Sequence, residues 1–149
     1  MSLISLEEQL RLLDEQIQLG KHDENSDDYK ALIDKRRLIS NDISGCQKYI
    51  RGSQEYLSEK EVELRRTKRE SEEGLLNSST SKSSQEKRAY AKMLAEEIIP
   101  RLERDVRSTQ IEIQKRTMVL SGVPWQEAIE KCQRMKDGFE EPEEELTLF

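Results

Sequence analysis

The chain has 149 residues, of which 38% are charged and 34% hydrophobic, and its formal net charge is −6. A compact globule of this size is usually about half apolar, so the composition excludes one thick core. It allows narrow apolar seams between long helices, in which each residue buries one face only. Because no run is long and apolar enough to span a membrane and the first residues do not resemble a signal peptide, we expect a cytoplasmic protein without a membrane segment.

The first predicted helix covers residues 3–19. Its large apolar residues recur at alternating steps of three and four, which is the spacing of a heptad seam. These residues are Leu3, Leu6, Leu10, Leu13 and Ile17. Ser5 followed by Glu8 resembles a capping box at the helix start, and Gly20 suits its end.

The second predicted helix covers residues 28–73. Its seam starts as Tyr29, Leu32, Arg36, Ile39, Ile43, Cys46 and Ile50, and continues as Ser53, Leu57, Lys60, Leu64, Thr67 and Ser71. The heptad spacing persists while the apolar content falls. Gly45 and Gly52 each cost about 1 kcal/mol relative to alanine inside a helix, but opposite charges three or four residues apart support the later part.

A serine-rich connector is predicted over residues 74–84, followed by a third helix over residues 85–121. The seam of this helix is Ala95, Ile99, Leu102, Val106, Thr109, Ile113 and Leu120, with Arg116 as an interruption. Pro100 lacks a backbone N–H, so we expect a kink there, because the seam keeps its register across it.

Gly122 and Pro124 predict the end of the third helix and the start of a fourth, over residues 124–137. One face of the fourth helix carries Trp125, Ala128, Ile129, Cys132 and Met135. Gly138 is expected to end it. These elements predict an all-α fold: an elongated helical hairpin or coiled coil with short flanking helices near one end. Residues 1–138 would form the body, and residues 139–149 a flexible acidic tail.

No arrangement of residues indicates catalysis, a metal, a cofactor or a small-molecule substrate, so we expect no enzyme. His22 lies near several carboxylates, but the spacing lacks the glycine and final glutamate of a calcium loop. Cys46 and Cys132 are expected to be buried apolar residues. The seams are narrow for a single chain, so we expect a homo-oligomer.

Residues 35–69 carry 10 basic and 5 acidic side chains. A candidate basic surface consists of Lys35, Arg36, Arg37, Arg65, Arg66 and Arg69. We favour a solvated face with internal ion pairs over docking onto an acidic protein. Nucleic acid is a third alternative and is not favoured, because no aromatic residues alternate with these cations to stack on bases.

The tail contains five glutamates and ends in the sequence Glu145-Leu146-Thr147-Leu148-Phe149. This pentapeptide resembles the motif by which bacterial polymerases and repair proteins dock on the replicative sliding clamp: glutamine, leucine, a small or acidic residue, leucine and phenylalanine. Glu145 stands where that family prefers glutamine. The resemblance implies that Leu146, Leu148 and Phe149 fill hydrophobic pockets on a protein partner.

Two functions therefore remain open from the sequence. The first is a non-enzymatic adaptor for DNA replication, DNA repair or phage genome maintenance that docks on a sliding clamp through its tail. The second is a stalk or spacer subunit, since the long helices resemble coiled-coil stalk proteins of bacterial export machines. In that case the tail would be a packed cap. The acidic tail also resembles those of single-stranded-DNA-binding proteins, which recruit other proteins.

Overall fold

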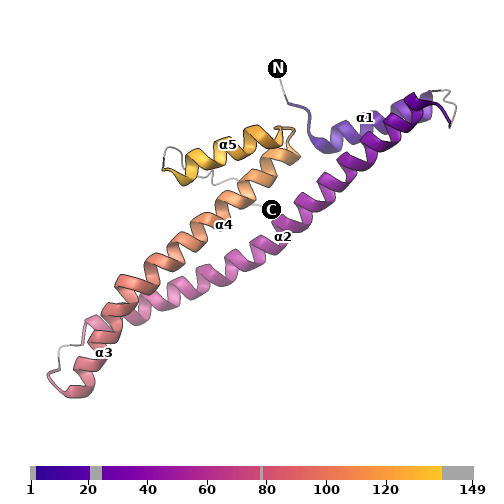
Figure 1. Ribbon diagram of the computed structural model, residues 1–149. Coiled ribbons are helices and arrows are strands. Elements are labelled where there is room, and N and C mark those ends of the chain that lie inside the picture. The colour runs from indigo at the N-terminus through magenta and orange to yellow at the C-terminus, as the bar shows by residue number, and fades with distance from the viewer. Residues whose placement is uncertain (1–2, 21–24, 78, 139–149) are drawn as a thin grey trace. The chain divides into compact units, whose positions relative to one another are not determined.

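The computed structural model describes residues 3–20, 25–77 and 79–138, so the predictions for the tail and for His22 lie outside the described residues. Throughout the described ranges the regular structure is helical, without strands, and α2 packs antiparallel to α3 and α4 (Figure 1), which confirms the all-α prediction. The elements are α1 (Leu6–Leu19), α2 (Asp27–Leu75), α3 (Lys82–Met93), the π-helix η1 (Leu94–Ile98), α4 (Ile99–Leu120) and α5 (Trp125–Lys136). None of the described helices is both long and apolar enough to cross a membrane.

The chain divides into two compact units. Unit 1 comprises Met1–Gly52 and Ile111–Phe149, and unit 2 comprises Ser53–Gln110. Unit 1 therefore contains α1, the first part of α2, the last part of α4 and α5. Unit 2 contains the rest of α2 together with α3, η1 and the first part of α4.

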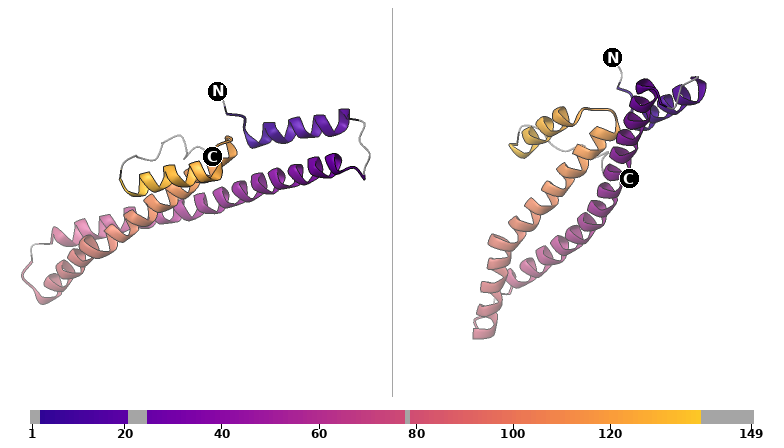
Figure 2. Two further views of the ribbon diagram at one scale, coloured as in Figure 1. Left: turned by 45° about the horizontal axis from the view of Figure 1, so that its top comes forward. Right: turned by 45° about the vertical axis from the view of Figure 1, so that its right-hand side comes forward.

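The core of unit 1 consists of small clusters between helix pairs. α1 runs antiparallel to the first part of α2, and α5 turns back along the last part of α4 (Figure 2). Buried Leu13, Ile39 and Ile43 hold the α1–α2 pair. The buried residues of the other two clusters are Cys46, Val119 and Ala128, and Ile111, Cys132 and Met135. Leu6 and Leu120 pack against the first two clusters, which joins α1 to the end of α4.

The predicted helix ends in unit 1 agree with the structure at several residues, but α1 begins at Leu6 and not at residue 3, so the predicted seam residue Leu3 lies outside the helix and is exposed. The Ser5 hydroxyl accepts a hydrogen bond from the Glu8 backbone N–H at 3.2 Å, and Gly20 caps the C-terminus of α1. Gly122 and Gly138, after α4 and α5, have φ angles of 105° and 88°, in the region that favours glycine. Gly122 is also tightly enclosed: a Cβ atom there would lie 2.2 Å from the carbonyl oxygen of Ile4.

Unit 2 is an antiparallel helix pair with a seam of small and polar residues. The Ser71 hydroxyl donates to the carbonyl of Ala91 at 2.9 Å. At Gly74, an added Cβ would lie only 2.5 Å from the Cβ of Ala91, so glycine allows the helices to approach closely. Leu57 from α2 and Leu94 and Leu102 from the returning helices are buried in the same unit.

The connector at the end of unit 2 is shorter than the predicted residues 74–84, because α2 continues to Leu75 and α3 already starts at Lys82. The Ser81 hydroxyl caps α3 by accepting from the Ser84 backbone N–H at 3.2 Å. Arg88 donates to the carbonyl of Asn77 at 2.8 Å and also to that of Ser79. Serine hydroxyls and one arginine therefore organise the turn.

The third predicted helix is interrupted by η1, which ends two residues before Pro100. Proline cannot donate to the carbonyl four residues earlier, and its ring crowds that carbonyl. The Ile99 N–H donates to the carbonyl of Leu94, five residues back, as in a π-helix. The chain thus continues as a helix past Pro100 by widening one turn, where the sequence predicted only a kink.

Candidate functional site

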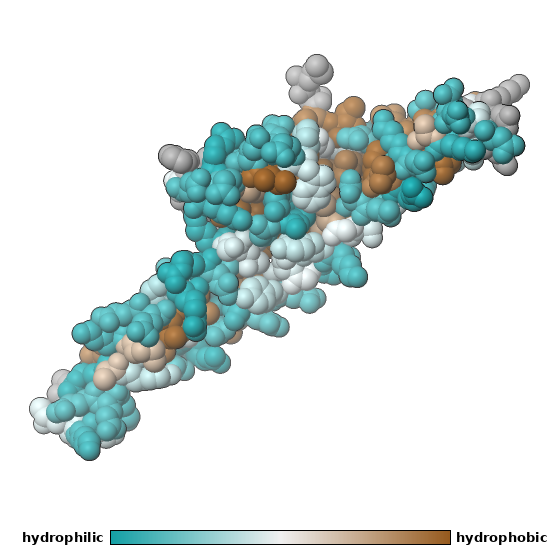
Figure 3. Space-filling model, viewed as in Figure 1, coloured by the Kyte–Doolittle hydropathy of each residue, from teal (hydrophilic) through white to brown (hydrophobic). Residues whose placement is uncertain are grey.

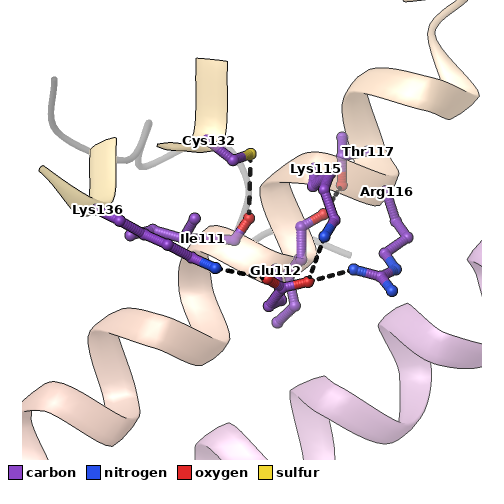
Figure 4. A network of polar contacts seen from close by, with 8 residues as sticks. Ile111, Glu112, Lys115, Arg116, Thr117, Cys132 and Lys136 are labelled. Carbon is purple, nitrogen blue, oxygen red and sulfur yellow. Dashed lines mark hydrogen bonds and ion pairs between the residues drawn. The ribbon is translucent and has the colours of Figure 1, made fainter. Parts of the chain in front are cut away.

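A network of charged side chains centred on Glu112 links α4 to α5 in unit 1 (Figure 4). The Glu112 carboxylate accepts hydrogen bonds from the ammonium groups of Lys115 at 2.8 Å and Lys136 at 3.2 Å, and it also pairs with the Arg116 guanidinium. Lys115 and Arg116 lie on α4, whereas Lys136 lies in the last turn of α5. Three cations around one carboxylate leave an excess of positive charge.

The environment of Glu112 keeps its carboxylate ionised. Burial alone would raise the pKa of Glu112, but the hydrogen bonds from Lys115, Lys136 and Arg116 outweigh it and lower this pKa to about 2. The Glu112 side chain is only 20% exposed, so water screens these pairs less than it screens the pairs elsewhere on the surface. Ion pairs of this network therefore hold the end of α5 against α4.

Arg116 also contacts aromatic residues from two other segments. Its guanidinium carbon lies 3.7 Å from the ring centroid of Tyr49 on α2 and 5.9 Å from that of Trp125 on α5. A planar guanidinium stacks favourably on aromatic rings. In the predicted seam, Arg116 is an interruption. In the structure it joins α2, α4 and α5.

A hollow of about 240 Å³ lies beside these residues, within unit 1. Its lining residues are Asn41, Asp42, Gly45, Cys46, Tyr49, Arg116 and Trp125. Tyr49 and Trp125 are 40% and 39% exposed. A Cβ atom added at Gly45 would meet nothing within 4 Å. Since pockets for drug-sized ligands measure about 300–1,000 Å³, this hollow suits one or two side chains.

Each unit contains a further groove. In unit 1, a groove of about 420 Å³ between α1 and α2 is lined by residues that include Asp14, Ile17, Ile33 and Arg36. In unit 2, a groove of about 670 Å³ is formed by the end of α2 and by α3. Its charged lining residues are Glu70, Glu73, Glu86 and Lys87, with the half-exposed Tyr90 beside them.

The structure divides the candidate basic surface between the two units. In unit 1, Arg36 pairs with Asp14 across the α1–α2 contact, and Arg37 pairs with Asp34 at 3.3 Å, whereas Lys35 is exposed. The remaining three, Arg65, Arg66 and Arg69, are exposed on the part of α2 that belongs to unit 2. Arg36 thus serves an ion pair within unit 1.

The two cysteines are buried and free, in separate clusters of unit 1. The Cys132 thiol lies 3.7 Å from the carbonyl oxygen of Ile111, and burial raises the pKa of both thiols. Within residues 3–20, 25–77 and 79–138, no three His, Cys, Asp or Glu side chains lie close enough together to hold a metal ion.

Glu112 and Lys136 were not predicted from the sequence, because both look like ordinary surface residues of a highly charged helix. The sequence feature that could have indicated this site is a pair of apolar residues. Ile111 and Met118 are seven residues apart on α4 and lie outside the predicted seam, yet both pack in the cluster with α5. A second heptad row on α4 therefore indicated a second packing partner.

Comparisons with protein-family models, with curated proteins and with solved structures found no match to this chain.

Proposed function

We propose that the protein is a non-enzymatic helical adaptor that recruits a protein partner through residues 145–149. The observation that carries the proposal is the sequence Leu146-Thr147-Leu148-Phe149 after five glutamates. It is similar at four positions to the sliding-clamp docking motif, so the partner we propose is a clamp of the DNA replication or repair machinery.

The described part of the chain supplies a suitable attachment for such a peptide. Helix α5 ends at Lys136, and Gly138 has a φ angle of 88°, which ends the helical path directly before the tail. The Glu112 network and the buried Ala128, Cys132 and Met135 fasten α5 to the rest of unit 1. A peptide that follows α5 is thus connected to a fixed helix.

Binding energies favour several tails acting together. Burying three large apolar side chains contributes roughly 1.5–3 kcal/mol each, while association costs about 4–15 kcal/mol. One tail alone should therefore bind weakly. We propose that the protein self-associates, so that several tails meet a ring-shaped partner and gain about 100-fold or more in avidity. Exposed Leu12, Leu19 and Leu38 on the helices of unit 1 supply apolar surface for self-association.

A bacterial sliding clamp is a direct probe of the proposal. We expect the double variant Leu148→Ala and Phe149→Ala to bind the immobilised clamp at least about tenfold more weakly than the unchanged protein, because each truncation removes roughly 1.5 kcal/mol or more. Surface plasmon resonance measures this loss. Circular dichroism and light scattering should show unchanged helicity and oligomer size.

The matched control is Glu143→Ala with Glu144→Ala, which changes the same tail but keeps its apolar residues and should retain most of the binding. Equal binding by the apolar double variant and the unchanged protein would contradict clamp recruitment through the tail. A melting temperature lowered by several degrees, with binding intact, would favour the stalk function with the tail as a packed cap.

A further inference from the structure

We propose that the hollow lined by Gly45, Tyr49, Arg116 and Trp125 is a docking site for the apolar end of the chain's own tail, with Leu148 and Phe149 as the occupants. The docking is intramolecular and holds the tail against unit 1. Its consequence for recruitment rests on the proposed function, whereas the docking itself can be measured without any partner.

The shape and lining of the hollow fit an aromatic side chain. Its volume of about 240 Å³ is below the range of drug-sized pockets, and the rings of Tyr49 and Trp125 form its walls. Aromatic rings pack favourably edge-to-face or offset against one another. Gly45 leaves the floor open, since no atom lies within 4 Å of the position a Cβ would take. A phenylalanine ring could therefore enter without moving the backbone of α2.

Chain length allows the tail to reach this hollow. Trp125 begins α5 and Gly138 follows its end, which puts them about 20 Å apart at 1.5 Å per residue. The segment 139–149 can span roughly 36–40 Å when fully extended, so it can run back along α5 with slack remaining. The first turn of α5, where Trp125 lies, is therefore within reach of Leu148 and Phe149.

Charge favours this path. The tail carries five glutamates, and its departure point on α5 has Arg134 and Lys136 in the last turn. The Glu112 network adds an excess of positive charge between α4 and α5. The opposing carboxylate in the hollow is that of Asp42. Acidic residues close to Gly138 therefore meet cations, and the apolar residues arrive at the aromatic walls.

Attachment to α5 compensates for the small size of the site. A short flexible linker gives an effective concentration in the millimolar range, so a contact that separate molecules form only at millimolar concentration can be largely formed within one molecule. Under the proposed function, a docked tail hides Leu148 and Phe149 from a partner. Recruitment would then require release of the tail from the hollow.

Trp125 is the single tryptophan of the chain, so its fluorescence reports directly on the hollow. We expect a variant truncated after Gly138 to emit at longer wavelength than the full chain and to be quenched by acrylamide about twofold more strongly. Adding a synthetic peptide of residues 139–149 at millimolar concentration should reverse both changes. The same peptide with Leu148→Ala and Phe149→Ala should leave them in place.

Two glycine variants provide a matched pair of backgrounds. Gly45→Leu fills the hollow, so truncation in that background should no longer change the emission. Gly52→Leu lies on the same helix, and a Cβ there also meets nothing within 4 Å, but Gly52 does not line the hollow. Truncation in the Gly52→Leu background should therefore give the full response.

The proposal is overturned if truncation leaves Trp125 emission and quenching unchanged, or if it changes them equally in the Gly45→Leu background. Clamp binding by Gly45→Leu tests the consequence separately, and a severalfold tighter binding is expected because the tail stays released. If Trp125 responds as expected and the clamp never binds, docking stands and the proposed function fails. If the clamp binds and Trp125 is silent, docking fails and the proposed function stands.

Discussion

Units 1 and 2 each form a buried core from few apolar residues, but they do so in different ways. Unit 1 brings segments of four helices together, and its buried residues are mostly large and apolar, such as Ile39, Ile111 and Met135. Unit 2 is a helix pair whose buried residues include the polar Thr67 and Ser71 and the small Ala91. The surfaces do not differ in the same way, since apolar side chains interrupt the hydrophilic surface over α1 and α5 and also over the helices of unit 2 (Figure 3).

This difference indicates what stabilises each unit. In unit 1, removal of apolar area from water is the main contribution, at roughly 25 cal/mol per Å². In unit 2, the close backbone approach at Gly74 and the hydrogen bond from Ser71 to the Ala91 carbonyl contribute to stability where large apolar side chains are few. Where the helices of unit 2 approach closely, at Gly74 and Ala91, packing depends on residues that remain small. The following substitutions test that contrast, from the largest expected effect to the smallest.

The largest effect is expected for Ile111→Ala in unit 1. Ile111 is 1% exposed and packs against Cys132 and Met135, so truncation leaves a cavity enclosed by two helices. The free energy of unfolding should fall by about 2–5 kcal/mol, measured by urea denaturation followed by circular dichroism. Leu57→Ala in unit 2, where the side chain is 7% exposed in a two-helix seam, should fall near the lower end of that range. Equal losses would remove the distinction between the units.

The same contrast explains which packing could be predicted from sequence. The seam of α2 within unit 2 was predictable because one face has one partner: Leu57, Thr67 and Ser71 are buried, and Ser53, Lys60 and Leu64 are half-buried, at the heptad positions. α4 was predicted incompletely, because in unit 1 it has contacts on more than one side. A single heptad row cannot report a second partner, so Ile111 and Gln114, each 1% exposed, were missed.

The candidate site was even less predictable. A glutamate in a charged helix gives no sign that it will be enclosed, and Glu112 becomes the centre of a network only because α5 turns back and places Lys136 beside it. Arg116 is recognised as a ring-stacking residue only once Tyr49 and Trp125 are near. Short-range features behaved differently: the ends of α1, α4 and α5 follow from Ser5, Gly122 and Gly138 themselves.

Glu112→Gln should give the next largest effect, and one that depends on pH. The folded-state pKa of Glu112 is lowered from 4.5 to about 2, which corresponds to on the order of 3 kcal/mol at neutral pH. Because the folded pKa lies below the unfolded one, this stabilisation is present above about pH 4.5 and is lost as the pH falls toward 2. The unchanged protein should lose it over that interval, and Glu112→Gln should lack it throughout. Urea titrations between pH 7 and pH 2 measure the difference.

The control for Glu112→Gln is Glu103→Gln in unit 2. Glu103 pairs with Lys68 at 3.7 Å, and both side chains are about half exposed, at 53% and 48%. Exposed pairs of this kind contribute about 0–1 kcal/mol, so the free energy of unfolding at neutral pH should fall by no more than about 1 kcal/mol. A loss of similar size at neutral pH in both variants would mean that the enclosure of Glu112 between α4 and α5 adds nothing.

The smallest effect is expected for Gly74→Ala in unit 2, and its sign is informative. An exposed helix interior normally gains about 1 kcal/mol when alanine replaces glycine. At Gly74 the new Cβ would lie 2.5 Å from the Cβ of Ala91 and 3.3 Å from the Lys87 carbonyl oxygen, so the helices must separate. Overpacking of this kind costs about 1–3 kcal/mol, and we expect a net loss in urea denaturation. Gly45→Ala in unit 1, where the added Cβ meets nothing within 4 Å, should instead be stabilising.

A reciprocal substitution separates this clash from any other effect of alanine at position 74. Ala91→Gly alone places a glycine inside α3 and should cost about 1 kcal/mol. Combined with Gly74→Ala, it leaves one methyl group at the same contact, as in the unchanged protein. The free energy of unfolding of the double variant should therefore fall by about 0.5–3 kcal/mol less than the two single losses added together. Additive losses would show that the two positions are not in contact. The close helix approach that distinguishes unit 2 from unit 1 would then be absent in solution.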